Sequence, residues 1–181
     1  MQADEIEGHL AALGLELQRR GVQTPVRILM VGGAYMLTQL HNRPSTQDVD
    51  VLLKDIPDPS ASPIYPLFKA AIHAIAVQAS LPDNWLNDVV GDALRNNGVV
   101  PEGTLWRTYD MLEVYLPPAE YMLALKLFAG RDRDRDDILA LCRQLTINSR
   151  QQAQDILDRY IPDQQLQQLH QVSDTLADLF P

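Results

Sequence analysis

The sequence has one cysteine, no long hydrophobic run and few basic residues. A single cysteine, Cys142, excludes an intramolecular disulfide and any metal site built from several cysteines. No stretch of about 18 apolar residues occurs, so we expect no membrane-spanning segment. The start, Met-Gln-Ala-Asp-Glu, has neither the basic nor the apolar part of a secretory leader, which makes a cytoplasmic location the expectation.

Acidic residues outnumber basic ones by 24 to 15, and the net charge is −9. Proteins that bind nucleic acid through a broad phosphate-contacting surface are usually basic. Long nucleic acid is therefore a disfavoured partner unless a local basic patch overrides the total, and an anionic membrane surface is disfavoured for the same reason. Hydrophobic residues make up 46% of the chain, which is enough for a globular core.

The spacing of apolar residues, prolines and glycines predicts a small mixed sheet with many helices, an α/β or α+β fold with a helical C-terminal part. The expected strands are 26–31, 48–53, 105–109 and 112–116, the last two forming a hairpin. The expected helices are 3–20, 34–41, 64–80, 85–96 with Asp83 as its N-cap, 118–130, 133–145 and two within 149–180. The predicted domain covers residues 1–145, and residues 146–181 are expected to pack on it as a helical extension.

Two aspartates, Asp48 and Asp50, stand two residues apart in the expected strand 48–53. Side chains at positions i and i+2 of a strand point to the same face, where two carboxylates repel each other unless a cation lies between them. The neighbours Val49 and Val51 are apolar, so we expect the pair at a sheet edge or in a cleft. A divalent metal, Mg²⁺ or Mn²⁺, fits such a pair; the alternative is a solvated strand end.

A glycine pair, Gly32 and Gly33, closes the strand 26–31 and begins the next helix. These glycines permit a tight turn, and the N–H groups at a helix N-terminus bind phosphate oxygens well. Metal and phosphate together suggest a nucleotide. Neither Gly-x-Gly-x-x-Gly nor Gly-x-x-x-x-Gly-Lys is present, so those two nucleotide-binding folds are unsupported. Arg43 and Thr46 precede the aspartates and either contact a phosphate or serve the turn alone.

A lysine in an apolar helix, Lys126, either extends its ammonium to solvent or faces a cleft where it can bind a triphosphate. The charge run 131–137 follows, and Asp134 and Asp137 share a helix face. One of them is expected to pair with Lys126 or with an active-site arginine, and a solvated loop is the alternative. Glu113, on the strand 112–116, is the candidate third carboxylate of a two-metal site.

The order of these motifs resembles that of a known superfamily. Gly-Gly, then Arg-Pro-Ser-Thr-Gln-Asp-Val-Asp-Val, then a distal Lys-Leu-Phe-Ala-Gly-Arg-Asp-Arg-Asp-Arg-Asp-Asp-Ile looks like the DNA polymerase β-type nucleotidyltransferases. More narrowly, the chain is similar to minimal bacterial nucleotidyltransferase-like proteins of unknown function, which are relatives of the nucleotidyltransferase toxins of abortive-infection toxin–antitoxin pairs. The segment Trp85-Leu-Asn-Asp also looks like a part of those minimal proteins. The likeness covers about residues 25–145.

The resemblance implies that Asp48 and Asp50 hold Mg²⁺ or Mn²⁺ and that the glycine pair lies against the phosphates of an NTP. A helical lysine and a later aspartate matter in the toxin relatives, and they map to Lys126 and Asp137 as catalytic residues. The implied reaction moves a nucleoside monophosphate from the NTP to an acceptor (tRNA, a protein or a small molecule) and releases pyrophosphate. One metal ion would activate the acceptor hydroxyl and a second would stabilise the leaving pyrophosphate.

An alternative function is a catalytically degenerate member of the superfamily that binds a nucleotide or a partner protein without chemistry. Ala34-Tyr35 follow the glycine pair where many active relatives have serine, which removes a side-chain phosphate donor. A cognate toxin or antitoxin is then an expected partner, bound through the acidic surface and the helical tail. The tail can also pack between two copies of the chain in a homodimer.

Overall fold

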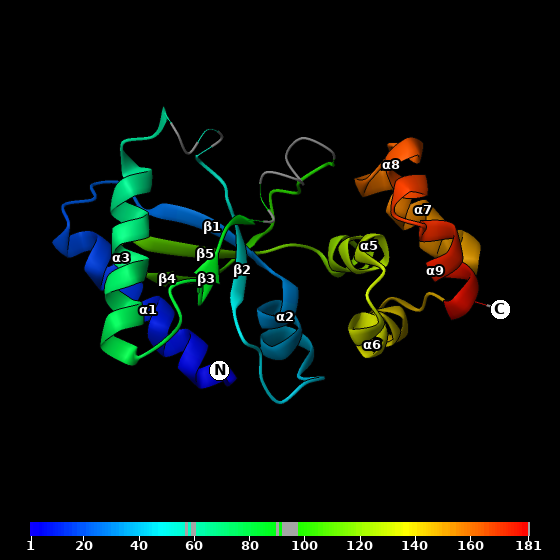
Figure 1. Cartoon of the computed structure of the whole chain (residues 1–181), viewed down its shortest axis with the longest axis horizontal. Helices are drawn as coiled ribbons and strands as arrows, with labels where there is room; N and C mark the ends of the chain where they lie inside the picture. The colour runs from blue at the N-terminus through cyan, green and yellow to red at the C-terminus, as the bar shows by residue number, and fades with distance from the viewer. Residues whose placement is uncertain (57, 59–60, 90, 92–97, 181) are drawn as a thin grey trace. The chain divides into compact units, whose positions relative to one another are not determined.

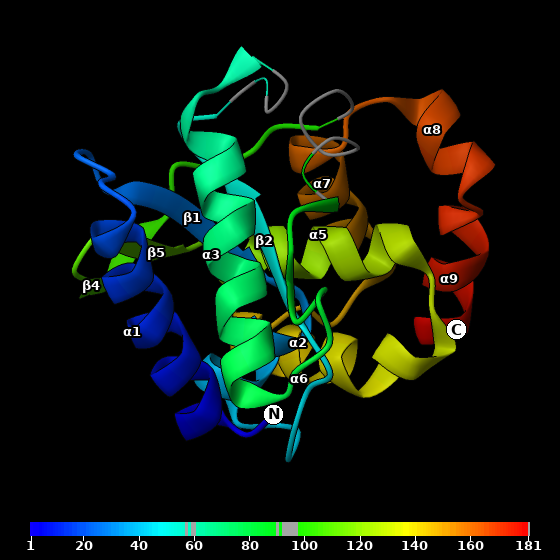
Figure 2. The same ribbon diagram turned by 60° about the vertical axis from the view of Figure 1, so that its left-hand side comes forward.

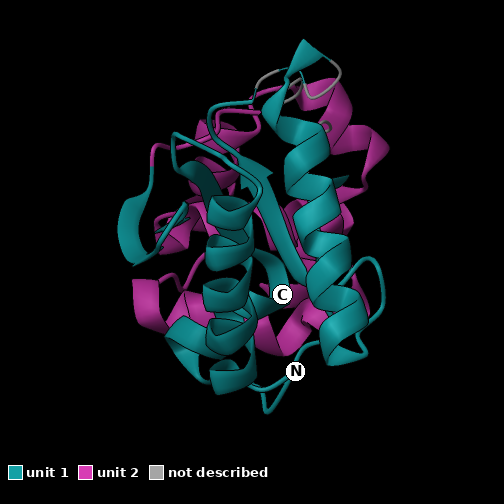
Figure 3. Cartoon of the chain, turned by 90° about the vertical axis from the view of Figure 1, so that its left-hand side faces the viewer, with its two compact units in different colours: residues 1–91, 103–116 teal, residues 92–102, 117–181 magenta. Residues whose placement is uncertain are grey.

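The computed structural model describes residues 1–56, 58, 61–89, 91 and 98–180. The chain divides into two compact units, coloured in Figure 3. Unit 1 comprises residues 1–91 and 103–116, and unit 2 comprises residues 92–102 and 117–181. This division does not test the domain boundary expected at residue 145, which stays a prediction.

Unit 1 contains a five-stranded mixed sheet with the strand order β3-β2-β1-β5-β4. The strands are β1 (Val26–Val31), β2 (Val49–Leu53), β3 (Leu86–Asn87), β4 (Thr104–Tyr109) and β5 (Leu112–Leu116). Strand β1 runs antiparallel to β2 and parallel to β5, while β2 runs parallel to β3. Strands β4 and β5 form the expected antiparallel hairpin. A mixed sheet flanked by helices confirms the predicted fold class.

Helices α1 (Ala3–Arg19) and α3 (Ile64–Ala79) pack side by side on one face of this sheet (Figures 1 and 2). Alternate strand residues face these helices and build the core, among them Ile28, Met30, Val49, Val51 and Val114, all with no exposed surface. Side-chain direction alternates along a strand. The residues between these core positions, which include Asp50, therefore belong to the opposite face of the sheet.

A helical segment follows β1 without a linker. It begins as α2 (Gly32–Tyr35) and continues as one π-helical turn over Met36–Leu40. The helix expected over 34–41 therefore starts two residues earlier, at the first glycine of the pair. Single π-helical turns are rare and are frequent at functional sites.

The helix expected from Trp85 is wrong at its start. Trp85 is fully buried and donates a hydrogen bond from Nε1 to the Ile72 carbonyl, 3.1 Å away. The next two residues form β3, which pairs with β2. Asp83, expected as the N-cap, instead has its Oδ1 atom 2.9 Å from Nδ1 of His73. Most of the remaining span of that expected helix, residues 90 and 92–96, lies outside the described residues.

Among its described residues, unit 2 contains helices and connecting segments but no strand. Its helices are α5 (Ala119–Ala129), α6 (Arg135–Leu145), α7 (Arg150–Tyr160), α8 (Gln164–Leu169) and α9 (Val172–Leu179). A 3-10 turn over Asp132–Asp134 leads into α6. The tail forms three helices where two were expected, because the chain turns again at Gln171, which has a φ of 52°. Within the described ranges, no helix has the length and apolar character needed to cross a membrane.

Candidate functional site

The first glycine of the pair lies directly against an aspartate of the neighbouring strand. A Cβ atom placed on Gly32 would fall 2.5 Å from Oδ2 of Asp50. The sheet register explains this approach, because Val31 is paired with Asp50 and the chain turns over the carboxylate at the next residue. Gly32 also has a φ of +65°, a region that L side chains rarely adopt. Both requirements are met by glycine alone.

The second glycine lies against the turn that precedes the aspartates. A Cβ atom on Gly33 would clash with Oγ1 of Thr46 and would lie 2.9 Å from Nη1 of Arg43. The buried Thr46 hydroxyl donates a hydrogen bond to the carbonyl oxygen of Asp48 at 3.2 Å. The Thr46 backbone N–H donates to the Met1 carbonyl at 3.0 Å. The glycine turn and this segment therefore form one packed arrangement.

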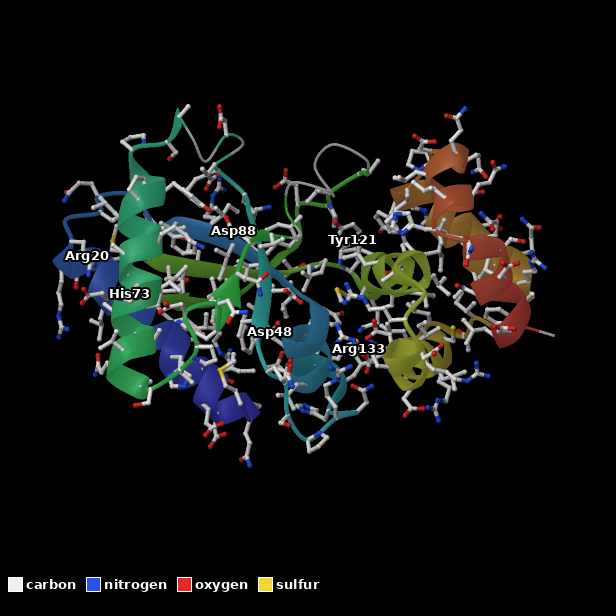
Figure 4. All side chains as sticks on the ribbon, in the orientation of Figure 1. Arg20, Asp48, His73, Asp88, Tyr121 and Arg133 are labelled. Atoms are coloured by element: carbon white, nitrogen blue, oxygen red, sulfur yellow. The ribbon has the colours of Figure 1, made fainter. Side chains whose placement is uncertain are left out.

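Unit 1 thus brings together six residues that the sequence analysis singled out: Gly32, Gly33, Arg43, Thr46, Asp48 and Asp50. Asp48, labelled in Figure 4, lies one residue before β2, and Asp50 lies on the strand. Both aspartates are only partly buried. Both aspartates are therefore only partly shielded from solvent, and the glycine turn lies against the Asp50 carboxylate.

The donor set suits magnesium better than a metal that needs a complete protein shell. In the part of the chain that the structure describes, no three His, Cys, Asp or Glu side chains are grouped to hold a metal ion. Magnesium commonly takes one or two carboxylates from the protein and keeps several waters or binds substrate phosphates. A pair of partly exposed aspartates beside bare glycine backbone meets that requirement.

The expected third carboxylate, Glu113, lies elsewhere on the sheet. It pairs with Arg27 on β1, whereas Asp50 pairs with Val31. The two carboxylates are therefore separated by four residues, roughly 13 Å, along the strands and by two strand spacings, about 10 Å, across them. Glu113 instead accepts a hydrogen bond of 2.9 Å from the Tyr115 hydroxyl, which raises the pKa of that tyrosine. This position does not suit a shared metal site, and Glu113 is not included in the proposed site.

Lys126 of α5 forms a buried ion triad within unit 2. Its ammonium lies 2.7 Å from Oδ1 of Asp134 and 2.7 Å from Oδ2 of Asp137. The exposed fractions are 6% for the lysine, 7% for Asp134 and 2% for Asp137. The sequence predicted a pairing with one aspartate, and both are present. Two carboxylates thus already compensate the charge that was expected to bind a triphosphate.

A hollow of about 530 Å³ also lies in unit 2, where α6 and the residues after it meet Leu179 and Phe180. Its lining is mostly apolar and includes Leu139, Cys142, Leu179 and Phe180. Burial raises the pKa of the Cys142 thiol, which keeps it in the unreactive neutral form. The polar lining residues of this hollow are Arg143, Thr146 and Asn148, and none of them was predicted to bind metal or nucleotide, so the chemistry-bearing candidates remain those of the glycine turn and the ion triad.

One residue beside the glycine turn has no local signal in the sequence. Asn87 of β3 is paired with Asp50 of β2. Only the strand register places these two residues at the same level of the sheet. The segment Trp85-Leu-Asn-Asp pointed to this region, but it did not indicate which residue pairs with Asp50.

Replacing Gly32 with alanine is expected to destabilise the protein more than the same change at Gly21. Both glycines have a positive φ, +65° and +79°, so alanine is strained at each by about 1–2 kcal/mol. Only at Gly32 would the new Cβ also meet Asp50, because nothing lies within 4 Å of the corresponding position at Gly21. Urea denaturation measures the difference. Equal losses would show that Gly32 serves the backbone turn alone.

Comparison with known proteins adds no family to this description. The chain matches no protein-family model, no curated protein and no solved structure. The class that the structure defines is a mixed α/β sheet protein with a helical second unit.

Proposed function

We propose that the protein is a Mg²⁺-dependent nucleotidyltransferase that moves a nucleoside monophosphate from an NTP to an acceptor and releases pyrophosphate. The observation that supports it most is the approach of Gly32 to the Asp50 carboxylate. This approach sets bare backbone beside a carboxylate pair that can hold a metal. An NTP presents its phosphates and its metal ion together, so one small site can bind both.

The chain's own residues have distinct parts in this proposal. Asp48 and Asp50 hold the metal, and the backbone of Gly32 and Gly33 lies against the phosphates. Arg43, whose Nη1 lies near the Gly33 position, adds positive charge to this side of the site. When bound, the metal lowers the pKa of the attacking hydroxyl and stabilises charge on the leaving pyrophosphate. The acceptor oxygen forms a bond to the α-phosphorus as the bond from that phosphorus to the bridging oxygen breaks, so pyrophosphate leaves with the electron pair and the hydroxyl proton passes to water.

Lys126 and Asp137 enter the proposal through the resemblance to the toxin relatives. In unit 2 their side chains are joined by an ion pair of 2.7 Å. For Lys126 to bind a phosphate, its ammonium must exchange at least one carboxylate for a phosphate oxygen. Asp137 would then keep the lysine in place through the remaining ion pair.

A second candidate is a catalytically degenerate protein of the same type that binds a nucleotide or a protein partner. The double pairing of Lys126 favours it, because an ammonium held by two buried carboxylates serves stability without any substrate. A cognate toxin or antitoxin, or a second copy of the chain, is the expected protein partner. This candidate binds ligands without releasing pyrophosphate, which separates it from the enzyme.

Thermal unfolding with and without Mg²⁺ and each of the four NTPs tests the site directly. A ligand that binds only the folded state raises the unfolding midpoint by mass action. At about 100 times the dissociation constant, the expected rise is about 5–10 °C for a chain of this size. The rise should require the metal and should be absent from the Asp48→Asn/Asp50→Asn variant.

Asp110→Asn is the matched control for this measurement. It makes the same chemical change at an exposed turn residue with a φ of 46°, and asparagine tolerates that conformation. Its midpoint should rise with ligand as in the native protein. No rise in the native protein, together with a double variant more stable than native, would instead mean that the carboxylates repel each other in a site without metal affinity.

A further inference from the structure

A third oxygen-bearing side chain lies beside the aspartate pair, on a strand that the sequence did not predict. Strand β3 runs parallel to β2 with Val49 paired to Leu86 and Asp50 paired to Asn87. Adjacent strands lie about 4.8 Å apart, and directly paired residues of parallel strands point to the same face. Asn87 is therefore a neighbour of Asp50 across the sheet.

The residues on either side of Asn87 fix the direction of its side chain. Leu86 is fully buried in the core formed with α1 and α3. Asp88 is also buried, and its Oδ1 lies 3.5 Å from Nζ of Lys69 on α3. Figure 4 labels Asp88, which directly follows β3, and Asp48, which directly precedes β2. Because side chains alternate along a strand, Asn87 faces the side on which Asp50 lies.

The Asn87 carboxamide is available for a ligand. It is partly exposed, and the structure shows no hydrogen bond from it to another described residue. Its oxygen is the type of donor that hard divalent cations take alongside carboxylates. On the other side of β2, Glu113 of β5 is too far along the sheet to serve. Strand β3 thus supplies the donor that β5 does not.

We propose that Asn87 is a metal ligand of the site, so that Asp48, Asp50 and the Asn87 carboxamide oxygen hold one divalent cation. This inference rests on the proposed function for its metal. The two carboxylates balance the charge of the cation, and the neutral carboxamide adds an oxygen without further negative charge. The remaining positions stay open to water and to the phosphates of the substrate.

Manganese titration followed by electron paramagnetic resonance tests the ligand, because free Mn²⁺ is counted directly and no activity is needed. Asn87→Ala should weaken Mn²⁺ binding by at least about tenfold. Asn87→Asp should bind Mn²⁺ at least as tightly as the native protein, since a carboxylate replaces the carboxamide with a stronger donor. Water proton relaxation at bound Mn²⁺ should increase in Asn87→Ala, because a water takes the vacated position.

Asn84 supplies the matched controls, because it is exposed and lies three residues earlier in the chain. Asn84→Ala and Asn84→Asp repeat the two changes without reaching the site, so both should bind Mn²⁺ as the native protein does. Equal tightening by Asn84→Asp and Asn87→Asp would show a general charge effect and overturn the inference. The unfolding midpoint without metal checks that each variant folds, and Asn87→Asp keeps the residue's shape if the alanine variant does not fold.

The outcomes separate the two proposals. If Asp50→Asn loses Mn²⁺ binding while Asn87→Ala binds as the native protein does, the metal site stands and the role of Asn87 is overturned. If the native protein binds no Mn²⁺, or if Asp50→Asn binds it unchanged, the metal site itself is misplaced and both proposals fall. If Asn87→Ala binds Mn²⁺ more weakly while Asn87→Asp and both Asn84 variants keep their binding, the result supports both the metal site and the role of Asn87.

Discussion

Replacing Asp50 with asparagine is expected to lower nucleotidyl transfer by at least about a thousandfold while the fold survives. A metal at a transferring phosphoryl group contributes several kcal/mol of transition-state stabilisation, and each 1.4 kcal/mol is about tenfold in rate. Asparagine keeps the size of the side chain, so the close approach of Gly32 is preserved. The measurement is transfer of label from α-³²P-labelled NTPs in the presence of Mg²⁺ and a cell extract that supplies acceptors.

Two comparisons make this experiment decisive. Asp110→Asn, at an exposed turn residue of the same unit, should transfer label at the native rate. Separation of the products into RNA, protein and small molecules identifies the acceptor class from the same reaction. Unchanged transfer in Asp50→Asn would remove this residue from the site. Nucleotide binding by the native protein without any pyrophosphate release would favour the degenerate binding protein.

Local sequence was sufficient to predict the tight turn at the glycine pair, because an apolar strand ending in two glycines allows few other geometries. The shared face of Asp48 and Asp50 stays a prediction, because strand β2 begins at Val49, one residue after Asp48. The structure adds the register that pairs Val31 with Asp50, and this pairing explains why a side chain at residue 32 would meet the carboxylate. The periodicity of residues along a chain indicates which face of a strand or helix each side chain occupies. The register between two strands depends on the tertiary structure and is not visible in that periodicity.

The same distinction explains what the sequence could not predict. The pair Trp85-Leu86 is apolar and fits a helix or a strand equally well by periodicity. Pairing with β2 decides the outcome, and a two-residue strand is too short to leave a pattern of its own. For Glu113, the sequence predicted a ligand that the register does not support. Its face and residue type suit a metal ligand, but its register with Arg27 places it far along the sheet from Asp50.

The ion triad was partly predictable because its partners are close in the chain. Lys126 lies in the last turn of α5, and the charge run begins a few residues later, so a pairing with one aspartate followed from proximity. The second pairing depends on the 3-10 turn over Asp132–Asp134, which brings Asp134 and the first turn of α6 to the same ammonium. The helix propensities of residues 131–137 do not distinguish a 3-10 turn from the ordinary start of an α-helix.

Replacing Lys126 with methionine is expected to lower the free energy of unfolding by about 3–5 kcal/mol. The change removes the charge that compensates two buried carboxylates, each less than one-tenth exposed, and leaves them facing each other. Urea denaturation measures the loss. Lys69→Met is the matched control, because that lysine side chain is 45% exposed and lies 3.5 Å from one carboxylate, Asp88, rather than from two, so its loss should be smaller.

A triple variant separates charge from packing. If uncompensated carboxylates cause the loss, then Lys126→Met combined with Asp134→Asn and Asp137→Asn should recover a large part of it, because no buried negative charge remains. A loss that persists in the triple variant would assign the effect to packing of the lysine stem. A loss no larger than that of Lys69→Met would mean that the two ion pairs contribute little to stability in solution, so the ammonium is free to bind phosphate. If Lys126→Met destabilises the protein no more than Lys69→Met does, a loss of activity in a Lys126 variant is evidence for a catalytic role. If the destabilisation is larger, unfolding of the variant accounts for the loss of activity.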